Sequence, residues 1–230
     1  PPLPHGLPPR SLGAVTPRRV IIRVLITIVE LFVLGALLVP LLSRHTTSVQ
    51  RLDVARGDLV DVHIDRGAMT VHRGDAGFTA KRGYVLSEPS ITVTRTDTGV
   101  AVNATCPGGA FVSCSTDIDL TVPEGVNVSV RTARGPITVR DASGEVYARS
   151  DLGRISVSGA PEVAQARSVE NDITLDLAAR PREVGATSET GAIVVRLPGG
   201  AYKTVDVVSK AGARTVKGVT SDTDAKGTIV

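Results

Sequence analysis

The sequence is poor in aromatic residues: it has no Trp, three Tyr and three Phe among its 230 residues. Enzymes that act on carbohydrates usually hold sugars against aromatic rings, which combine a large apolar face with a polar edge. This scarcity argues against a carbohydrate-active enzyme on a β-helix scaffold.

Motifs for catalysis are also missing. No Gly-x-Ser-x-Gly motif accompanies His63 or His72, and no phosphate-binding Gly-rich loop opens a helix. The two histidines fall at alternating strand positions, so we interpret them as solvent-facing. Five acidic residues could form paired carboxylates, but we interpret them as outward strand positions: Asp117, Asp119, Glu170, Asp172 and Asp176. The sequence therefore predicts no enzyme activity, no metal site and no cofactor.

A basic excess is missing beyond the N-terminal region. Four of the 26 Lys and Arg residues and one of the 23 Asp and Glu residues precede Ser43, so the rest of the chain is formally neutral. Nucleic-acid binding requires a clustered basic patch, and none is visible in the sequence. Nucleic acid is therefore not an expected partner.

What the sequence does contain is a repeat, aliphatic-x-aliphatic-x-Ser/Thr-x-x-Gly-x-Ile-x-Val, between Val126 and Val216. Alternation of this kind places the aliphatic side chains on one face of a strand. From residue 135 onward, successive glycine positions are 18, 18, 20 and 21 residues apart. A period near 20 residues indicates stacked repeats. The glycine positions, including an earlier copy, are Gly67, Gly135, Gly153, Asn171, Gly191 and Gly212.

The repeat predicts an all-β fold, a β-solenoid in which rungs of about 18–21 residues stack like a parallel β-helix. An antiparallel β-meander or sandwich is the alternative. Stacking would align the hydroxyls of Thr132, Ser150, Ser168, Ser188 and Ser209, and would also align Ile137, Ile155, Ile173 and Ile193. We expect the glycine positions to form a structural column at the turns, where a positive φ favours Gly.

The repeats and their lead-in, Val-Pro-x-Gly-Val over 122–126, resemble the putative-adhesin β-strand-repeat family, a bacterial domain family of unknown function. The resemblance extends from about Val60 to the end of the chain. It implies a β-strand-repeat fold and an adhesin-like role. The family usually has Gly-Asp-Ile at the turn, whereas this chain has Gly-Pro-Ile, Gly-Arg-Ile, Asn-Asp-Ile and Gly-Ala-Ile. No shared acidic site is therefore implied.

Residues 20–42 form an apolar run that is long enough to span the hydrocarbon core of a membrane as a helix. Arg23 lies near one end, where its side chain could reach the headgroups. Glu30 lies near the middle and would cost about 2.5–3.5 kcal/mol, which the aliphatic residues outweigh. The run therefore predicts a single transmembrane helix with Glu30 as an intramembrane charge.

The flanking segments set the expected topology. Residues 1–19 are rich in Pro and contain Arg but no acid, which is typical of a disordered tail that stays in the cytoplasm. The polar stretch 43–58 would be a linker, and 59–230 would be an extracytoplasmic β-strand-repeat domain. This predicts a single-pass protein of the cell membrane. Cleavage of the apolar run as a signal peptide is the alternative.

Cys106 and Cys114 are the only cysteines. Their short separation and Gly-rich loop suit a disulfide in an exported domain, which would add about 2–3 kcal/mol of stability. A metal or redox pair is the alternative, but no His lies nearby and the spacing is not Cys-x-x-Cys. We therefore predict a disulfide.

Two functional hypotheses follow. The first is a non-enzymatic, membrane-anchored surface or envelope protein that presents an adhesin-like binding module outside the membrane to an unknown surface ligand or envelope protein. The second is an envelope-stress sensor or regulatory component that acts through a membrane partner. Neither requires a small-molecule cofactor.

Overall fold

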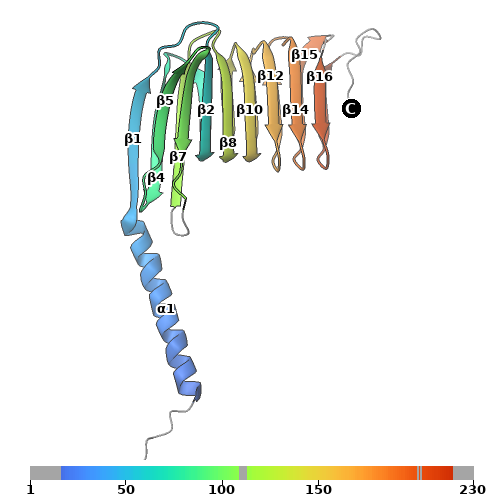
Figure 1. The fold of residues 1–230 in the computed structure, drawn as a ribbon. Helices are drawn as coiled ribbons and strands as arrows, with labels where there is room; N and C mark the ends of the chain where they lie inside the picture. The colour runs from blue at the N-terminus through green and yellow to red at the C-terminus, as the bar shows by residue number, and fades with distance from the viewer. Residues whose placement is uncertain (1–16, 109–112, 201, 203, 220–230) are drawn as a thin grey trace, which may run out of the picture. The chain divides into compact units, whose positions relative to one another are not determined.

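The computed structural model describes residues 17–108, 113–200, 202 and 204–219 (Figure 1). The chain divides into two compact units, Pro1–Ser43 and Arg44–Val230. In the first unit, the described residues form the helix α1 (Pro17–Leu42). The first sixteen residues of the predicted tail lie outside the described residues.

The predicted transmembrane helix over 20–42 is not supported. Among the described residues, no helix is long and apolar enough to cross a membrane. The prediction of a membrane span is therefore wrong, as is the single-pass membrane location based on it. Arg23 and Glu30 interrupt the apolar run, and both charges were expected to be tolerable within a membrane span. Both residues are exposed on α1, and the intramembrane role of Glu30 depended on that span.

Within the described residues of the second unit, strands form two sheets, a nine-stranded sheet A and an eight-stranded sheet B. In spatial order, sheet A contains β1 (Ser43–Arg51), β4 (Gly77–Val85), β7 (Ser113–Val122), β3 (Met69–Arg73), β9 (Ile137–Ala142), β11 (Ile155–Gly159), β13 (Ile173–Leu177), β15 (Ile193–Gly200) and β17 (Arg214–Val219). Sheet B contains β16 (Val205–Ser209), β14 (Glu183–Ser188), β12 (Val163–Ser168), β10 (Glu145–Leu152), β8 (Asn127–Arg134), β2 (Leu59–Arg66), β6 (Gly99–Thr105) and β5 (Ser90–Thr96). The all-β prediction is confirmed.

Each copy of the repeat forms a rung, which is one strand of sheet B followed by one strand of sheet A. Consecutive rungs pair in parallel and in register, so that Ser150 faces Ser168 and Ile155 faces Ile173. This is the arrangement that stacking requires and that a meander does not produce. Figure 1 shows β8, β10, β12, β14 and β16 side by side in chain order.

The N-terminal strands depart from this order. The rung β2/β3, which matches the repeat, lies between β6/β7 and β8/β9. Two pairs, β4 with β7 and β5 with β6, are antiparallel. The predicted linker 43–58 is wrong in its first half, because 43–51 form β1. This edge strand is largely exposed, so it lacks the hydrophobic alternation by which strands are recognised.

The core lies between the two sheets and is made of aliphatic columns. Ile137, Ile155, Ile173 and Ile193 are each 0% exposed. Met69 and Ile118 extend this column toward the N-terminal strands. Arg214 ends it, because β17 places this exposed residue beside Ile193. Period-two alternation therefore directs one face of every rung into the core.

The aligned hydroxyls satisfy the backbone at the corners between the two sheets. Ser188 is 0% exposed. Its Oγ donates to the carbonyl oxygen of Asn171 at 3.2 Å and accepts the N–H of Gly191 at 2.9 Å. Ser168 and Ser209 likewise accept the N–H of Asn171 and of Gly212, so these three serines join the corner of their own rung to the corner of the rung before. The corresponding Oγ-to-carbonyl distances are 3.0 Å for Ser150, 3.4 Å for Ser168 and 2.9 Å for Ser209.

The glycine column does lie at these corners, but positive φ does not explain most of it. Among its members only Gly67 and Gly135 have positive φ, at 140° and 144°. At Gly153 a Cβ atom would overlap the carbonyl oxygen of Gly135, and at Gly191 it would overlap that of Asn171. The requirement is therefore close stacking of successive corners. At Asn171, which carries a side chain, the neighbouring bond from Ser168 to Gly153 is the longest of the serine bonds.

Candidate functional site: a groove on the outward face of sheet B

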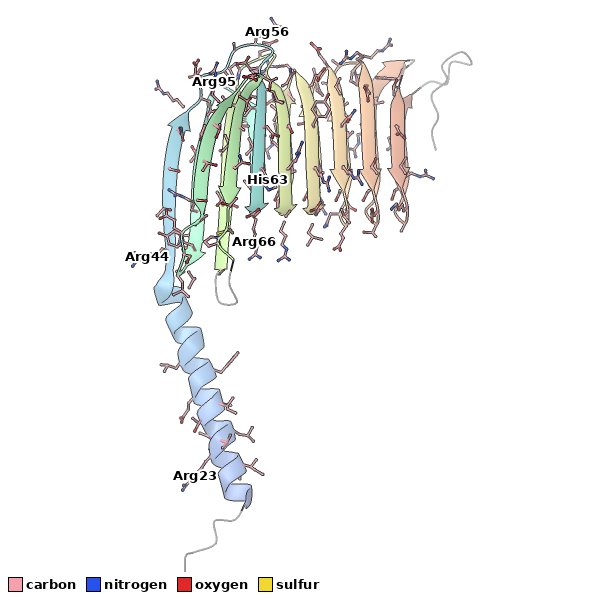
Figure 2. The ribbon with its side chains drawn as sticks, in the orientation of Figure 1. Arg23, Arg44, Arg56, His63, Arg66 and Arg95 are labelled. Carbon is pink, nitrogen blue, oxygen red and sulfur yellow. A yellow bond between two sulfur atoms is a disulfide. The ribbon has the colours of Figure 1, made fainter. Side chains whose placement is uncertain are left out.

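The residues that sequence analysis considered for chemistry are scattered over the second unit. His63 lies on β2 in sheet B (Figure 2), with Nε2 3.6 Å from the Asp65 carboxylate. His72 lies on β3 in sheet A, with Nδ1 3.1 Å from Asp119. Within the described residues, no group of three or more His, Cys, Asp or Glu side chains could hold a metal ion.

Three of the remaining acidic candidates have structural partners, and the fourth, Glu170, is exposed just after β12. Asp117 accepts the backbone N–H of Ala68 at 2.8 Å, and Asp172 accepts that of Ala192 at 2.9 Å. Asp176 lies 3.8 Å from Arg196. These carboxylates form hydrogen bonds at corners or an ion pair between neighbouring strands, and they do not converge on one cavity.

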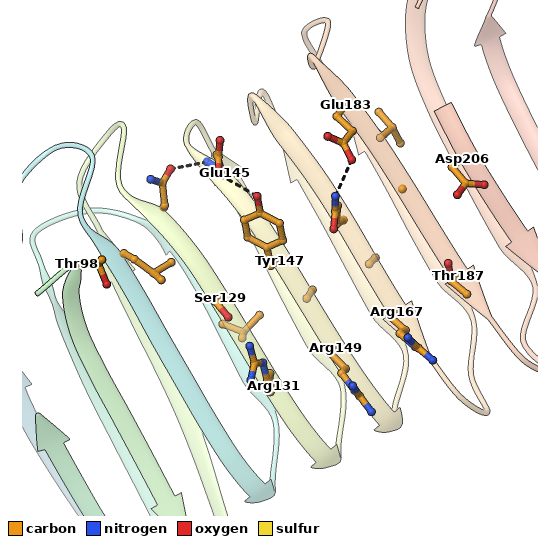
Figure 3. Close-up of a pocket in the computed structure, with 18 of the residues that line it drawn as sticks. Thr98, Ser129, Arg131, Glu145, Tyr147, Arg149, Arg167, Glu183, Thr187 and Asp206 are labelled. Atoms are coloured by element: carbon orange, nitrogen blue, oxygen red, sulfur yellow. Dashed lines mark hydrogen bonds between the residues drawn. The ribbon is translucent and has the colours of Figure 1, made fainter. Parts of the chain in front are cut away.

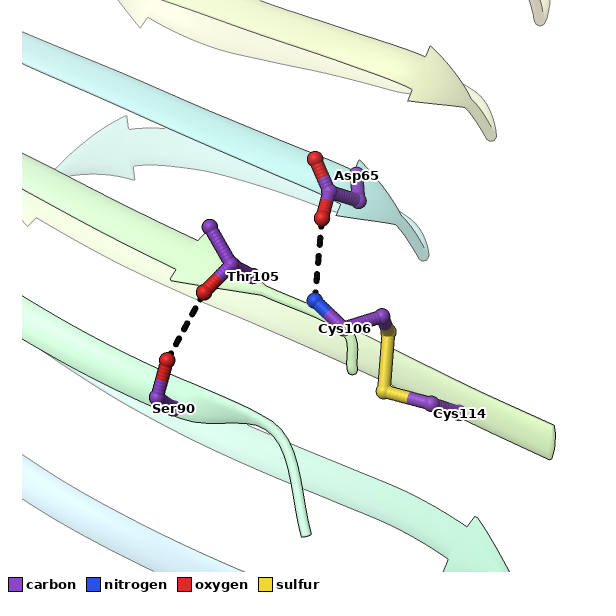
Figure 4. Close-up of a disulfide and its surroundings, with 5 residues drawn as sticks. All are labelled: Asp65, Ser90, Thr105, Cys106 and Cys114. Carbon is purple, nitrogen blue, oxygen red and sulfur yellow. Dashed lines mark hydrogen bonds between the residues drawn. A yellow bond between two sulfur atoms is a disulfide. The ribbon is translucent and has the colours of Figure 1, made fainter. Parts of the chain in front are cut away.

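The predicted disulfide between Cys106 and Cys114 is confirmed (Figure 4). Cys114 is buried, and the backbone N–H of Cys106 donates to Asp65 on β2 at 2.9 Å. The hydroxyls of Ser90 and Thr105 lie 2.7 Å apart on the neighbouring strands. The bridge therefore belongs to the packing of the N-terminal strands.

A groove of about 760 Å³ lies on the outward face of sheet B (Figure 3). It crosses β8, β10, β12 and β14, so equivalent positions of successive rungs line it. No histidine or cysteine is among its lining residues. Those that carry polar or charged side chains are Thr98, Asn127, Ser129, Arg131, Glu145, Tyr147, Arg149, Gln165, Arg167, Glu183, Thr187 and Asp206.

Three exposed arginines form a column along the groove. Arg149 faces Arg131 on one side and Arg167 on the other in the parallel register, so their Cα atoms repeat at the strand spacing of about 4.8 Å. Arg149 lies 3.6 Å from Asp151. Within the described residues, Arg131 and Arg167 have no ion-pair partner. The groove therefore presents a row of guanidinium groups along the stacking direction.

A second row is polar and acidic. Glu145 accepts hydrogen bonds from Tyr147 and Arg182, each at 2.9 Å. The amide of Gln165 donates to Glu183 at 2.7 Å. Burial raises the pKa of the Tyr147 phenol above its usual value, and the hydrogen bond to Glu145 and its negative charge raise it further. Tyr147 therefore keeps its proton beside the carboxylate, with 37% of its surface exposed.

The sequence patterns did not lead to this groove, because none of the residues that they singled out for chemistry is among those that line it. The sequence nevertheless contains a signal for the arginine column. In three successive copies, Arg immediately precedes the Ser/Thr position, at Arg131, Arg149 and Arg167. A charge that recurs at one position of a stacking repeat predicts a column, because equivalent positions align in register.

No protein-family model matches the sequence, and no curated protein matches it. Among solved structures, a putative cell adhesion protein from Clostridium sporogenes matches with a TM-score of 0.49 and 12% identity, over 76% of this chain and 98% of that chain. A putative adhesin from Bacteroides fragilis matches with a TM-score of 0.37 and 12% identity, over 75% and 96%. A putative adhesin from Parabacteroides merdae matches with a TM-score of 0.28 and 11% identity, over 76% and 91%. Likenesses this distant carry no conclusion about this chain.

Proposed function

We infer that this chain is a non-enzymatic, adhesin-like binding protein and that the groove on sheet B is its binding surface. The observation that carries this proposal is the groove itself. Its volume of about 760 Å³ is of the size in which proteins bind ligands, and it is built from side chains that repeat along the array. Repeat arrays commonly bind extended partners along such a face.

The chemistry of the groove supports binding rather than catalysis. Its lining offers guanidinium, amide, carboxylate and phenol groups, which can hold a ligand through hydrogen bonds and charge. Nucleophilic catalysis requires a hydroxyl or thiol that a neighbouring base or a lowered pKa activates. In the groove the Tyr147 hydroxyl lies beside the Glu145 carboxylate, but burial and Glu145 raise its pKa, which is the opposite of activation. The disulfide between Cys106 and Cys114 also supports an exported protein, since such bonds persist in oxidising compartments.

The test is to fill the groove without disturbing the fold. Gly185 lies in the groove, and a Cβ atom there would meet only Cγ of Gln165, at 3.6 Å. Gly185→Trp therefore places a large side chain in the groove with little backbone strain. The matched control is Thr174→Trp, on the outward face of sheet A.

The full chain and both variants are applied to a printed array of surface polymers that contains acidic and neutral polysaccharides, mucin, collagen and fibronectin. We expect the parent and Thr174→Trp to bind at least one polymer, and Gly185→Trp to lose that binding. If the parent binds none of them, or if Gly185→Trp binds as the parent does, the proposed function is wrong.

A further inference from the structure

The arginine column has no structural explanation within the array. Like charges at directly facing positions of neighbouring strands repel one another, and Arg131, Arg149 and Arg167 face each other in register. Only Arg149 has an acidic partner among the described residues, at 3.6 Å. Such a column becomes favourable when an anionic ligand lies along it.

The guanidinium group specifies the kind of anion. Its planar fork of N–H donors matches the two oxygens of a carboxylate or phosphate. Since the three arginines repeat at about 4.8 Å along the stack, the ligand that uses all of them is a chain with anionic groups at intervals. A single small anion would engage one arginine or two.

The acidic row of the groove limits how densely charged the bound polymer can be. Glu145 and Glu183 line the groove in a row of their own, with Glu145 four residues before Arg149 on β10, and Asp206 lies on β16 (Figure 3). A polyphosphate or a nucleic acid would place closely spaced charges against these carboxylates, which repel them. A polymer that also carries hydroxyl groups would instead donate hydrogen bonds to the carboxylate and amide oxygens.

We propose that the groove binds a carboxylated polysaccharide, such as a polymer of uronic acids, with its carboxylates on Arg131, Arg149 and Arg167 and its hydroxyls on the acidic row. This rests on the proposed function and names its ligand class. The scarcity of aromatic residues does not oppose it, because charge and hydrogen bonds replace most of the stacking that sugar sites use. Tyr147 supplies one exposed ring between the two rows.

The experiment measures the affinity of the full chain for polygalacturonate oligosaccharides. The matched ligand is the same oligosaccharide with its carboxylates methyl-esterified, which keeps the sugar and removes the charge. Polyphosphate and single-stranded DNA are the alternative polyanions. We expect binding to polygalacturonate that weakens as salt rises, with much weaker binding to the other three ligands.

The variants separate the arginine column from charge in general. Arg149→Gln removes the middle guanidinium, and we expect it to raise Kd for polygalacturonate by about tenfold or more, as for a lost charge-assisted hydrogen bond. Arg196→Gln removes an arginine from the outward face of sheet A, where it pairs with Asp176, and should leave Kd unchanged. Thermal melts check that both variants fold as the parent does.

Each outcome decides the proposal. Equal affinity for the esterified oligosaccharide, tighter binding of polyphosphate or DNA, or equal losses in Arg149→Gln and Arg196→Gln would overturn it. If the polymer array shows binding through the groove to a neutral polysaccharide or a protein while polygalacturonate does not bind, the ligand class is wrong but the proposed function stands. If the array shows no binding at all, both are wrong.

Discussion

From β8 to β17, each strand pairs in parallel with the corresponding strand of the next rung, whereas the region from β1 to β7 mixes parallel and antiparallel pairs. Both regions have cores of alternating aliphatic residues. They differ in their polar groups. In the later rungs, buried serines are bonded to the preceding corner. Among the described residues, the buried hydroxyls of Thr116 on β7 and of Thr132 on β8, the first strand of the later region, have no partner.

Thr132 is the first hydroxyl of the aligned column, and its neighbour on the N-terminal side is Ile64. The serines after it donate to a backbone carbonyl of the preceding corner, as Ser150 does to Gly135. Within the described part of the chain Thr132 makes no such bond, although the carbonyl oxygen of Gly67 lies at the preceding corner. The bonded column therefore begins at Ser150.

The largest expected effect tests the close stacking of the corners. In Gly153→Ala, the new Cβ would overlap the carbonyl oxygen of Gly135, so the backbone must shift. We expect a loss in the free energy of unfolding of about 1–3 kcal/mol or more, measured by denaturant unfolding. Gly185→Ala is the control, because its Cβ has ordinary space. Equal stability of the two variants would contradict the stacking explanation.

The serine bonds predict the next largest effect. Ser188→Ala removes the donor to Asn171 and leaves the buried N–H of Gly191 without its acceptor. An unsatisfied buried group costs about 1–3 kcal/mol, and urea unfolding should show a loss in this range. The half-buried Ser156 of β11 makes no comparable bond among the described residues, so Ser156→Ala should stay within about 0.5 kcal/mol of the parent.

Thr132→Val should not lower the free energy of unfolding, in contrast to Ser188→Ala. The hydroxyl is buried without a partner, and valine has nearly the same shape. Replacing an unsatisfied polar group by an apolar one is nearly neutral or stabilising, so we expect unfolding free energy to stay equal or rise by up to about 1 kcal/mol. A loss as large as that of Ser188→Ala would remove the distinction between the unbonded Thr132 and the bonded serines of the later rungs.

The smallest expected effect concerns the groove. Glu145→Gln removes the negative charge beside Tyr147, so the pKa of the phenol should fall, although burial, the larger cause, keeps it above the usual value. Because the folded state holds this proton more tightly, the resulting stability is present below the usual tyrosine pKa and is lost as pH rises through the folded pKa. Ultraviolet difference titration of the variant and the parent measures the change. Glu183→Gln, which acts on Tyr147 through charge alone, should lower the pKa less, and an equal pKa in all three proteins would contradict this account.

Much of the regular array could be predicted, because its partners are neighbours in the sequence. The alternation at Val128 and Val130 identifies the inward face, and the period places Ile137 beside Ile155. The pairing of Cys106 with Cys114 could also be predicted from their spacing. These features depend on one repeat or on two adjacent ones.

The position of β2/β3, the reason for the glycine corners and the groove could not be predicted, because each depends on contacts that a local sequence pattern does not contain. The rung β2/β3 lies between β6/β7 and β8/β9 because its strands pair with strands that are distant in the sequence. The residues of β2 fit the repeat pattern at any position in the stack, so the pattern does not predict this position. The corners at Gly153 and Gly191 were assigned to backbone conformation, but contact with the preceding rung decides them. The groove is made of outward residues, whose roles appear only when equivalent positions are aligned in space.

The insertion of β2/β3 between two later rungs also sets the order in which the chain can assemble. When β2/β3 leaves the ribosome, both of its edges lack hydrogen-bonding partners, because the strands that pair with them come later in the sequence. The first partner, β6/β7, closes one side, and β8/β9 closes the other before the remaining rungs can add in sequence. We expect growth from β10 onward to be local and fast, and closure around β2/β3, which requires distant contacts, to set the folding rate. This rung would then be the nucleus from which the array extends.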